Sequence, residues 1–273
     1  MSSPDRVESA VPRRADPWMH LACLTPARVA LGRAGGSVPT RPLLDFQLAH
    51  ARARDAVQAP FDPRALADQI AALGHPVMRV ESAAGDKRAY LLRPDLGRML
   101  SDSSRERLAA EASRGAGWDV VLIVSDGLSA LAAHRQAVPT LAALLPELRA
   151  SGWKVAPIVV ASGGRVALED EIGQRLGAQL AVILLGERPG LGAPDSLGAY
   201  LVYEPRVGRT DAERNCVSNI RPEGLPPPRA ARRLYYLLSQ ARHHHLSGVR
   251  LKDESDLLDN EDRTTPIPAA SSG

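Results

Sequence analysis

The fold is decided by the stretch Asp119-Val120-Val121-Leu122-Ile123-Val124-Ser125-Asp126-Gly127. Its apolar run is nearly continuous, which is typical of a strand buried on both faces of a sheet. Working outward, further strands are expected at 154–160, 180–185 and 199–203. Helices are expected between them, at 128–137, 139–150 and 166–176. This alternation indicates βαβ units, so we expect an α/β fold with a doubly wound, mostly parallel, Rossmann- or flavodoxin-like sheet.

Before this region the sequence predicts a helical extension. We expect a helix at 42–57, and Asp62-Pro63 starts another that ends at Gly74, with a capping carboxylate followed by proline at the first helical position. Apolar runs at 77–82 and 88–92 predict a β-hairpin, and 101–114 is expected to be helical. We therefore divide the chain into a disordered tail, an N-terminal extension, an α/β domain and a second disordered tail, at 1–17, 18–115, 116–253 and 254–273.

The stretch 196–222, SLGAYLVYEPRVGRTDAERNCVSNIRP, is interpreted as a strand, a Gly/Pro turn and a helix. Thr210 and Glu213 have the spacing of a capping box. The helix that they open is expected to carry Cys216 and to stop before Pro222. A last helix is expected at 229–246.

Composition excludes several classes of protein. The 273 residues are 44% apolar, enough for one sizeable core and an appendage. A net charge of +3, 4% aromatic residues and no basic cluster with stacking aromatics disfavour nucleic-acid binding. No apolar run approaches the roughly 20 residues that span a bilayer, so no membrane is expected. The amino end lacks the apolar core of a secretory signal, which predicts a cytoplasmic chain with free thiols at Cys23 and Cys216.

Three Gly-containing turns are candidates for a ligand site. They follow buried strands at 125–127, 162–164 and 186–188, and ligands bind outside the carboxyl ends of parallel strands. Glycines admit a bulky ligand, but they also close tight turns, so both interpretations stay open here. None of these turns matches the nucleotide-binding glycine patterns or the Gly-x-Ser-x-Gly nucleophile motif.

Other candidates have a plainer interpretation. The run His243-His244-His245 is expected to project around a helix near its carboxyl end, where positive charge is favourable, so no metal site is predicted. From the residues alone, Cys216 is expected in the core and Glu187 in a solvated loop.

Five segments together resemble one family, the small subunit of ethanolamine ammonia-lyase. They lie at 25–37, 43–57, 125–130, 186–191 and 196–222, within a match that covers roughly residues 18–254. The resemblance implies an adenosylcobalamin-dependent radical lyase that converts ethanolamine to acetaldehyde and ammonia. It also implies a large catalytic partner subunit, with the small subunit closing over the cobalamin between them. The Asp-x-His-x-x-Gly motif, with which another class of cobalamin proteins supplies a cobalt ligand, is absent.

The resemblance also assigns site residues. Three positions match the family's cobalamin contacts: Val166 as an apolar or backbone contact, Glu187 as an acceptor for the corrin amides, and Cys216 as a packing or weak hydrogen-bonding group. No residue of this chain is expected to be catalytic. The N-terminal extension would dock on the large subunit, and packaging into a bacterial microcompartment stays open. The alternative is a non-catalytic α/β ligand-binding or scaffold protein.

Overall fold

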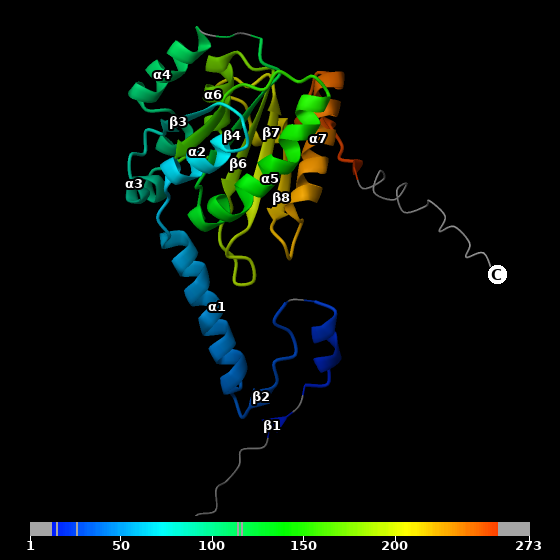
Figure 1. The fold of residues 1–273 in the computed structure, drawn as a ribbon. Helices are drawn as coiled ribbons and strands as arrows, with labels where there is room; N and C mark the ends of the chain where they lie inside the picture. Colours follow the sequence, from blue (N-terminus) through cyan, green and yellow to red (C-terminus); the bar gives the residue numbers. More distant parts are fainter. Residues whose placement is uncertain (1–12, 15, 26, 114, 116, 256–273) are drawn as a thin grey trace, which may run out of the picture.

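The computed structural model describes residues 13–14, 16–25, 27–113, 115 and 117–255. The strands in this part of the chain are β1 Arg13–Arg14, β2 Arg33–Ala34, β3 Val77–Glu81, β4 Val120–Ser125, β5 Ile158–Ser162, β6 Leu180–Gly186, β7 Leu197–Tyr203 and β8 Arg214–Ile220 (Figure 1). The α-helices are α1 Thr40–Gln58, α2 Pro63–Ala71, α3 Lys87–Leu92, α4 Asp102–Ala112, α5 Ala130–Ala150, α6 Leu168–Leu176 and α7 Pro227–His244. Short 3-10 helices are η1 Met19–Cys23, η2 Leu96–Arg98, η3 Asp211–Glu213 and η4 Gly248–Arg250.

The core is a six-stranded sheet with the order β3-β5-β4-β6-β7-β8. The first four of these strands run parallel to one another, whereas β7 is antiparallel to β6 and β8 is antiparallel to β7. Every residue of β4 and β6 is buried, as the apolar runs predicted. The α/β class, the mostly parallel sheet and the N-terminal helix are thereby confirmed.

Helices cover the two faces of the sheet unequally. One face packs against α2, α5 and α7 in a single large cluster of buried side chains. On the other face, α6 packs against β4 and β6, and α4 packs against α6 and β3. On this second face, the side chains of β7 and β8 lie beyond α6: Tyr200 is half-buried and Cys216 is exposed.

The predicted β-hairpin is wrong. Residues 88–92 form most of helix α3, because the Asp86 side chain accepts a hydrogen bond from the Ala89 N–H at 2.7 Å and caps the helix. Strand β3 instead pairs in parallel with β5, with Val77 opposite Ile158. A strand from the predicted N-terminal extension therefore belongs to the main sheet, and the boundary at residue 115 stays a prediction. The predicted tails lie almost wholly outside the described residues.

Two further boundaries differ from the prediction. The helices expected on either side of Pro139 form one helix, α5, which contains both Pro139 and Pro146. Both prolines are exposed, so the carbonyl groups that lose a helical donor can bond to water while the apolar face stays packed. The strand expected at 154–160 begins at Ile158, because Pro157 precedes it.

The helix expected to carry Cys216 is also wrong. The capping box is present, with Glu213 accepting from the Thr210 N–H at 2.8 Å, but it closes only the 3-10 turn η3. The chain then continues as strand β8, which pairs with β7. A register shift lies between the pairs Leu197–Ile220 and Ala199–Val217, so a β-bulge places Val217 and Ile220 on the same face of β8 although they are three residues apart. Arg214 is buried on the other face, against α6, so the buried residues of β8 recur every three positions and imitate a helical pattern.

Candidate functional site

The structure brings two of the three predicted site residues together on the half-covered face of the sheet. Glu187 directly follows β6 and is half-buried, while Cys216 lies in the middle of β8, opposite Tyr200 of β7. The charge of Glu187 acts on both Tyr200 and Cys216. Val166 lies in the turn between β5 and α6, half-buried against the same side of the core. We call the surface formed by Glu187, Gly198, Tyr200 and Cys216 the open sheet face.

The Glu187 carboxylate is fixed by its neighbours. Its Oε2 accepts from the Ser196 hydroxyl at 2.5 Å and from the Asn219 N–H at 3.3 Å. A Cβ atom at Gly198 would lie 2.8 Å from the other oxygen, Oε1, so the missing side chain of Gly198 leaves room for the carboxylate. Among the described residues Oε1 has no hydrogen-bond partner. The site therefore presents one anchored oxygen and one free acceptor.

Sequence reasoning missed Ser196 and Gly198 as parts of this site. They meet Glu187 because β7 runs antiparallel to β6, with Gly186 opposite Leu197. The sequence gives one hint, a glycine inside a strand pattern, which often marks a close approach of another group.

Cys216 and Tyr200 are both neutral at ordinary pH. Burial, followed by the charge of Glu187, raises the pKa of the Cys216 thiol to about 11 although part of the residue is exposed. Burial likewise raises the pKa of Tyr200, with a further contribution from the adjacent Cys216. A thiol attacks as its thiolate, so Cys216 lacks the low pKa of a nucleophilic cysteine. The open sheet face can accept hydrogen bonds and pack against a ligand.

The carboxyl ends of β4 and β5, in contrast, are bridged by the chain itself. Asp126 Oδ1 accepts from the Gly163 N–H at 2.8 Å, and the Lys87 ammonium donates to the Gly127 carbonyl at 2.9 Å. The Ser125 hydroxyl accepts from the Gly164 N–H at 2.9 Å. These contacts hold the turns at 125–127 and 162–164 together, but Asp126, Ser162 and Gly163 also line a cavity of about 450 Å³, so both interpretations of these two turns stay open. The turn at Glu187 is the one facing the open sheet face.

The rings of His243 and His244 are in contact, with centroids 4.8 Å apart, whereas His245 and His134 lie in separate surroundings. His245 is the left-handed residue that ends α7, and its Nδ1 lies 2.8 Å from the Tyr203 hydroxyl. His134 accepts from the Asp62 N–H at 3.1 Å through Nε2. No group of three or more His, Cys, Asp or Glu side chains that could hold a metal ion was found in the described part of the chain.

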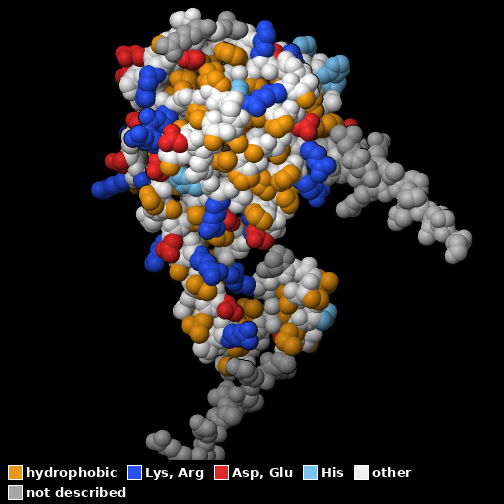
Figure 2. Space-filling model, in the orientation of Figure 1, with side chains coloured by type: hydrophobic (Ala, Val, Ile, Leu, Met, Phe, Trp, Pro, Cys, Tyr) orange, Lys and Arg blue, Asp and Glu red, His pale blue; other side chains and the backbone are white. Residues whose placement is uncertain are grey.

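A second candidate surface is the N-terminal segment. Helix α1 leads away from the layers of the sheet to a short irregular region that contains η1 (Figure 1). Large apolar side chains remain exposed there, including Leu44 at 56% and Leu48 at 50%, preceded in the sequence by Trp18, Met19 and Leu24 among others. Figure 2 shows hydrophobic side chains interspersed with Lys and Arg on this segment. Such a strip is typical of a surface that a protein partner covers.

Together the sheet order and the open sheet face define an α/β protein with one partly uncovered sheet face and an apolar N-terminal extension. None of the helices that can be described is long and apolar enough to cross a membrane. The chain belongs to the ethanolamine ammonia-lyase light chain family, whose family model matches residues 15–252.

Named relatives cover nearly the whole chain. It is 55% identical over 243 residues to the ethanolamine ammonia-lyase small subunit of Ralstonia nicotianae, which covers 89% of this chain and 90% of that protein. The corresponding subunit of Pseudomonas fluorescens is 53% identical over 250 residues, covering 90% of each chain. That of Azotobacter vinelandii is 54% identical over 247 residues, covering 90% of this chain and 92% of the relative.

Proposed function

We propose that this chain completes an adenosylcobalamin-dependent ethanolamine ammonia-lyase by closing over the cofactor against a large catalytic subunit. The complete enzyme converts ethanolamine to acetaldehyde and ammonia, a rearrangement with no net oxidation. Family membership supports the reaction, and the observation that carries this chain's part in it is the anchored Glu187 carboxylate beside the uncovered part of the sheet. The enzyme is expected in the cytoplasm, with its packaging into a microcompartment left open.

The residues of the open sheet face fit a corrinoid. Cobalamin carries amide side chains around its ring, and Glu187 Oε1 is an acceptor without a partner in the described part of the chain. Val166 offers an apolar contact, and the Cys216 thiol, neutral because its pKa is raised, can pack without adding charge. When bound, adenosylcobalamin supplies the radical chemistry. These residues bind and orient it and help to exclude water, and none acts as an acid, base or nucleophile.

The N-terminal extension is proposed to dock on the large subunit. The large exposed apolar residues of α1 lie at 43–48, and the exposed charged residues Arg52, Arg54 and Asp55 follow them one to two turns later. Apolar area would supply most of the association energy, and arginine can bind carboxylates of the partner in a bidentate manner.

Reconstitution tests the proposal. The purified chain should release no ammonia from ethanolamine with adenosylcobalamin, and addition of the large subunit should restore the reaction. Failure to restore it with a competent large subunit would favour the alternative, a non-catalytic ligand-binding or scaffold protein.

Glu187→Ala tests the site itself. The loss of a hydrogen bond should raise the Kd for cobalamin about tenfold, or about 1.4 kcal/mol, with a smaller change in the KM for ethanolamine. Glu106→Ala is the control, since Glu106 is exposed on α4, away from this face. An unchanged Kd in Glu187→Ala would remove Glu187 from the site.

A further inference from the structure

A buried ion cluster joins α6 to β8 next to the open sheet face. Arg214 of β8 donates to both oxygens of Asp170, at 2.8 and 2.7 Å, and to Glu169 Oε1 at 2.7 Å. The side chains of all three residues are 0–2% exposed. The bidentate pairing with Asp170 fixes the planar guanidinium in one orientation, so that the start of α6 and β8 are held in a single relative position.

A contribution to the stability of the fold does not by itself explain this cluster. Two carboxyl groups share one guanidinium, and Glu169 Oε2 is buried without a hydrogen-bond partner among the described residues. Burial raises the pKa of Glu169 well above its usual value, against the opposing effect of Arg214. Well-packed apolar side chains often stabilise a fold as much as a buried ion pair does, so the geometry that the cluster imposes needs another explanation.

The cluster lies between two predicted cofactor contacts. The Val166 carbonyl accepts from the Glu169 N–H at 3.1 Å, in the turn that leads into α6. On β8, Cys216 follows Arg214 by two residues and therefore projects from the same face of the strand. Glu169 also lies within electrostatic range of the Cys216 thiol. Any shift of α6 against β8 would therefore change the position of Val166 relative to Cys216.

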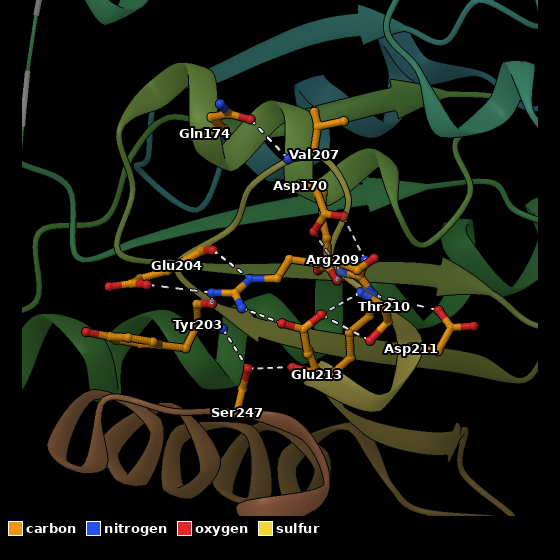
Figure 3. Close-up of polar contacts among 12 residues, drawn as sticks. Asp170, Gln174, Tyr203, Glu204, Val207, Arg209, Thr210, Asp211, Glu213 and Ser247 are labelled. Carbon is orange, nitrogen blue, oxygen red and sulfur yellow. Dashed lines mark hydrogen bonds and ion pairs between the residues drawn. The ribbon is translucent and has the colours of Figure 1, made fainter.

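The loop before β8 supports the same guanidinium. Arg214 donates to the Arg209 carbonyl at 3.1 Å. Arg209 in turn donates to the Tyr203 and Glu204 carbonyls, each at 3.1 Å, and pairs with Glu213. Figure 3 shows the Arg209 side chain between Glu204 and Glu213, with Asp170 above them in this view. Arg214 is thus hydrogen-bonded to α6 on one side and to the loop before β8 on the other.

We propose that Arg214, through its bidentate pairing with Asp170, is a positioning residue for the cobalamin surface, holding Val166 and Cys216 at a fixed separation. It does not touch the cofactor. This inference rests on the proposed function and adds to it a device that keeps this half of the site preformed before the large subunit and cofactor are bound.

Two substitutions in the assembled complex test this role against a merely structural one. Arg214→Lys keeps the positive charge but removes the bidentate fork, and Asp170→Asn weakens the same contact from the other side. Glu171→Gln is the matched control, because Glu171 is the next residue of α6 and is also buried, but pairs with Arg105 of α4. The measured quantities are the Kd for cyanocobalamin, from its absorption spectrum, and the melting temperature.

All three variants are expected to melt at a lower temperature than the wild type. Only Arg214→Lys and Asp170→Asn should raise the Kd for cyanocobalamin about tenfold, while Glu171→Gln changes it less than twofold. Equal Kd values in all three variants, with Glu187→Ala still weakened, would overturn the positioning role and leave the proposed function intact. A wild-type complex that binds no cyanocobalamin would instead overturn the proposed function.

Hydrogen exchange on the unsubstituted complex gives an independent test, which holds even if the variants do not fold. Addition of cyanocobalamin should slow amide exchange in residues 166–170 and 214–217 together, and leave α4 unchanged. Protection of one segment without the other would show that the cluster does not couple them, and would overturn the inference.

Discussion

Gly198→Ala is a direct test of how Glu187 is held. The new Cβ would lie 2.8 Å from Glu187 Oε1 and 3.1 Å from its Cγ, whereas ordinary contacts begin at 3.4 Å. The backbone of Gly198 is not in the left-handed region, so alanine is otherwise compatible with β7. The carboxylate must therefore move by several tenths of an ångström, away from the Ser196 hydroxyl and the Asn219 N–H.

The size of the effect follows from the contacts that are lost. A hydrogen bond to a charged group contributes about 1.5–3 kcal/mol, and water can replace part of it because Glu187 is only half-buried. We expect the free energy of unfolding to fall by about 1–2 kcal/mol, a value near the lower end of that range. For a chain of this size the melting temperature should fall by about 3–6 °C.

Urea denaturation and thermal melting of the isolated chain measure this loss, and a double-mutant cycle with Glu187→Ala assigns it. In the Glu187→Ala background nothing opposes the new Cβ, so Gly198→Ala should be neutral or slightly stabilising. Equal destabilisation in both backgrounds would refute the reasoning, because the loss would then come from the β7 backbone and not from Glu187.

Leu234→Ala should lower the free energy of unfolding by about 2.5–5 kcal/mol in urea denaturation, because the Leu234 side chain of α7 is fully buried in the core. A loss below about 1 kcal/mol, as for a surface substitution, would contradict this packing. The double substitution Leu44→Ser and Leu48→Ser should change the free energy of unfolding by only about 0.5 kcal/mol, because both side chains are exposed. It should nevertheless weaken assembly with the large subunit, measured by analytical ultracentrifugation. Unchanged assembly would argue against docking through α1. Burial and the charge of Glu187 raise the pKa of Cys216 to about 11, so its thiol stays protonated below that pH. Iodoacetamide should therefore modify Cys216 more slowly than Cys23 at pH 8, and the rate at Cys216 should rise as the pH approaches 11. Equal rates at pH 8, measured by mass spectrometry, would contradict the raised pKa.

Uninterrupted apolar runs were reliable predictors of the sheet. The runs of β4 and β6 are buried on both faces, so their hydrophobicity alone identifies them as central strands. Asp62 was equally reliable as a helix start, since its carboxylate accepts from the N–H groups of Arg64 and Ala65. In these places local chemistry and tertiary packing favour the same structure.

The errors arose where tertiary contacts decide between two local possibilities. The capping box at Thr210 is real, but a capping box does not fix how long the following helix becomes, and pairing with β7 converts the next residues into β8. The bulge in β8 places Val217 and Ile220 on one face, and Arg214 is buried on the other face, so these three buried residues have a helix-like spacing.

The candidate site was only partly predictable for the same reason. Glu187 could be singled out as a carboxylate after a buried strand, but its role as an anchored acceptor depends on β7 returning antiparallel beside β6. The cluster of Glu169, Asp170 and Arg214 joins residues more than forty positions apart, so no local pattern indicates it.

The parallel pairing of β3 with β5 constrains how the chain folds as it is synthesised. The two strands are separated by roughly eighty residues, so at about 5–20 residues per second β3 waits on the order of 4–16 s for its partner to be translated. During this delay its backbone edge is open to wrong pairing. Arg79 and Glu81 stay exposed on this strand and act as charged gatekeepers, so replacing them with apolar residues should promote aggregation of nascent chains well before it affects the finished protein.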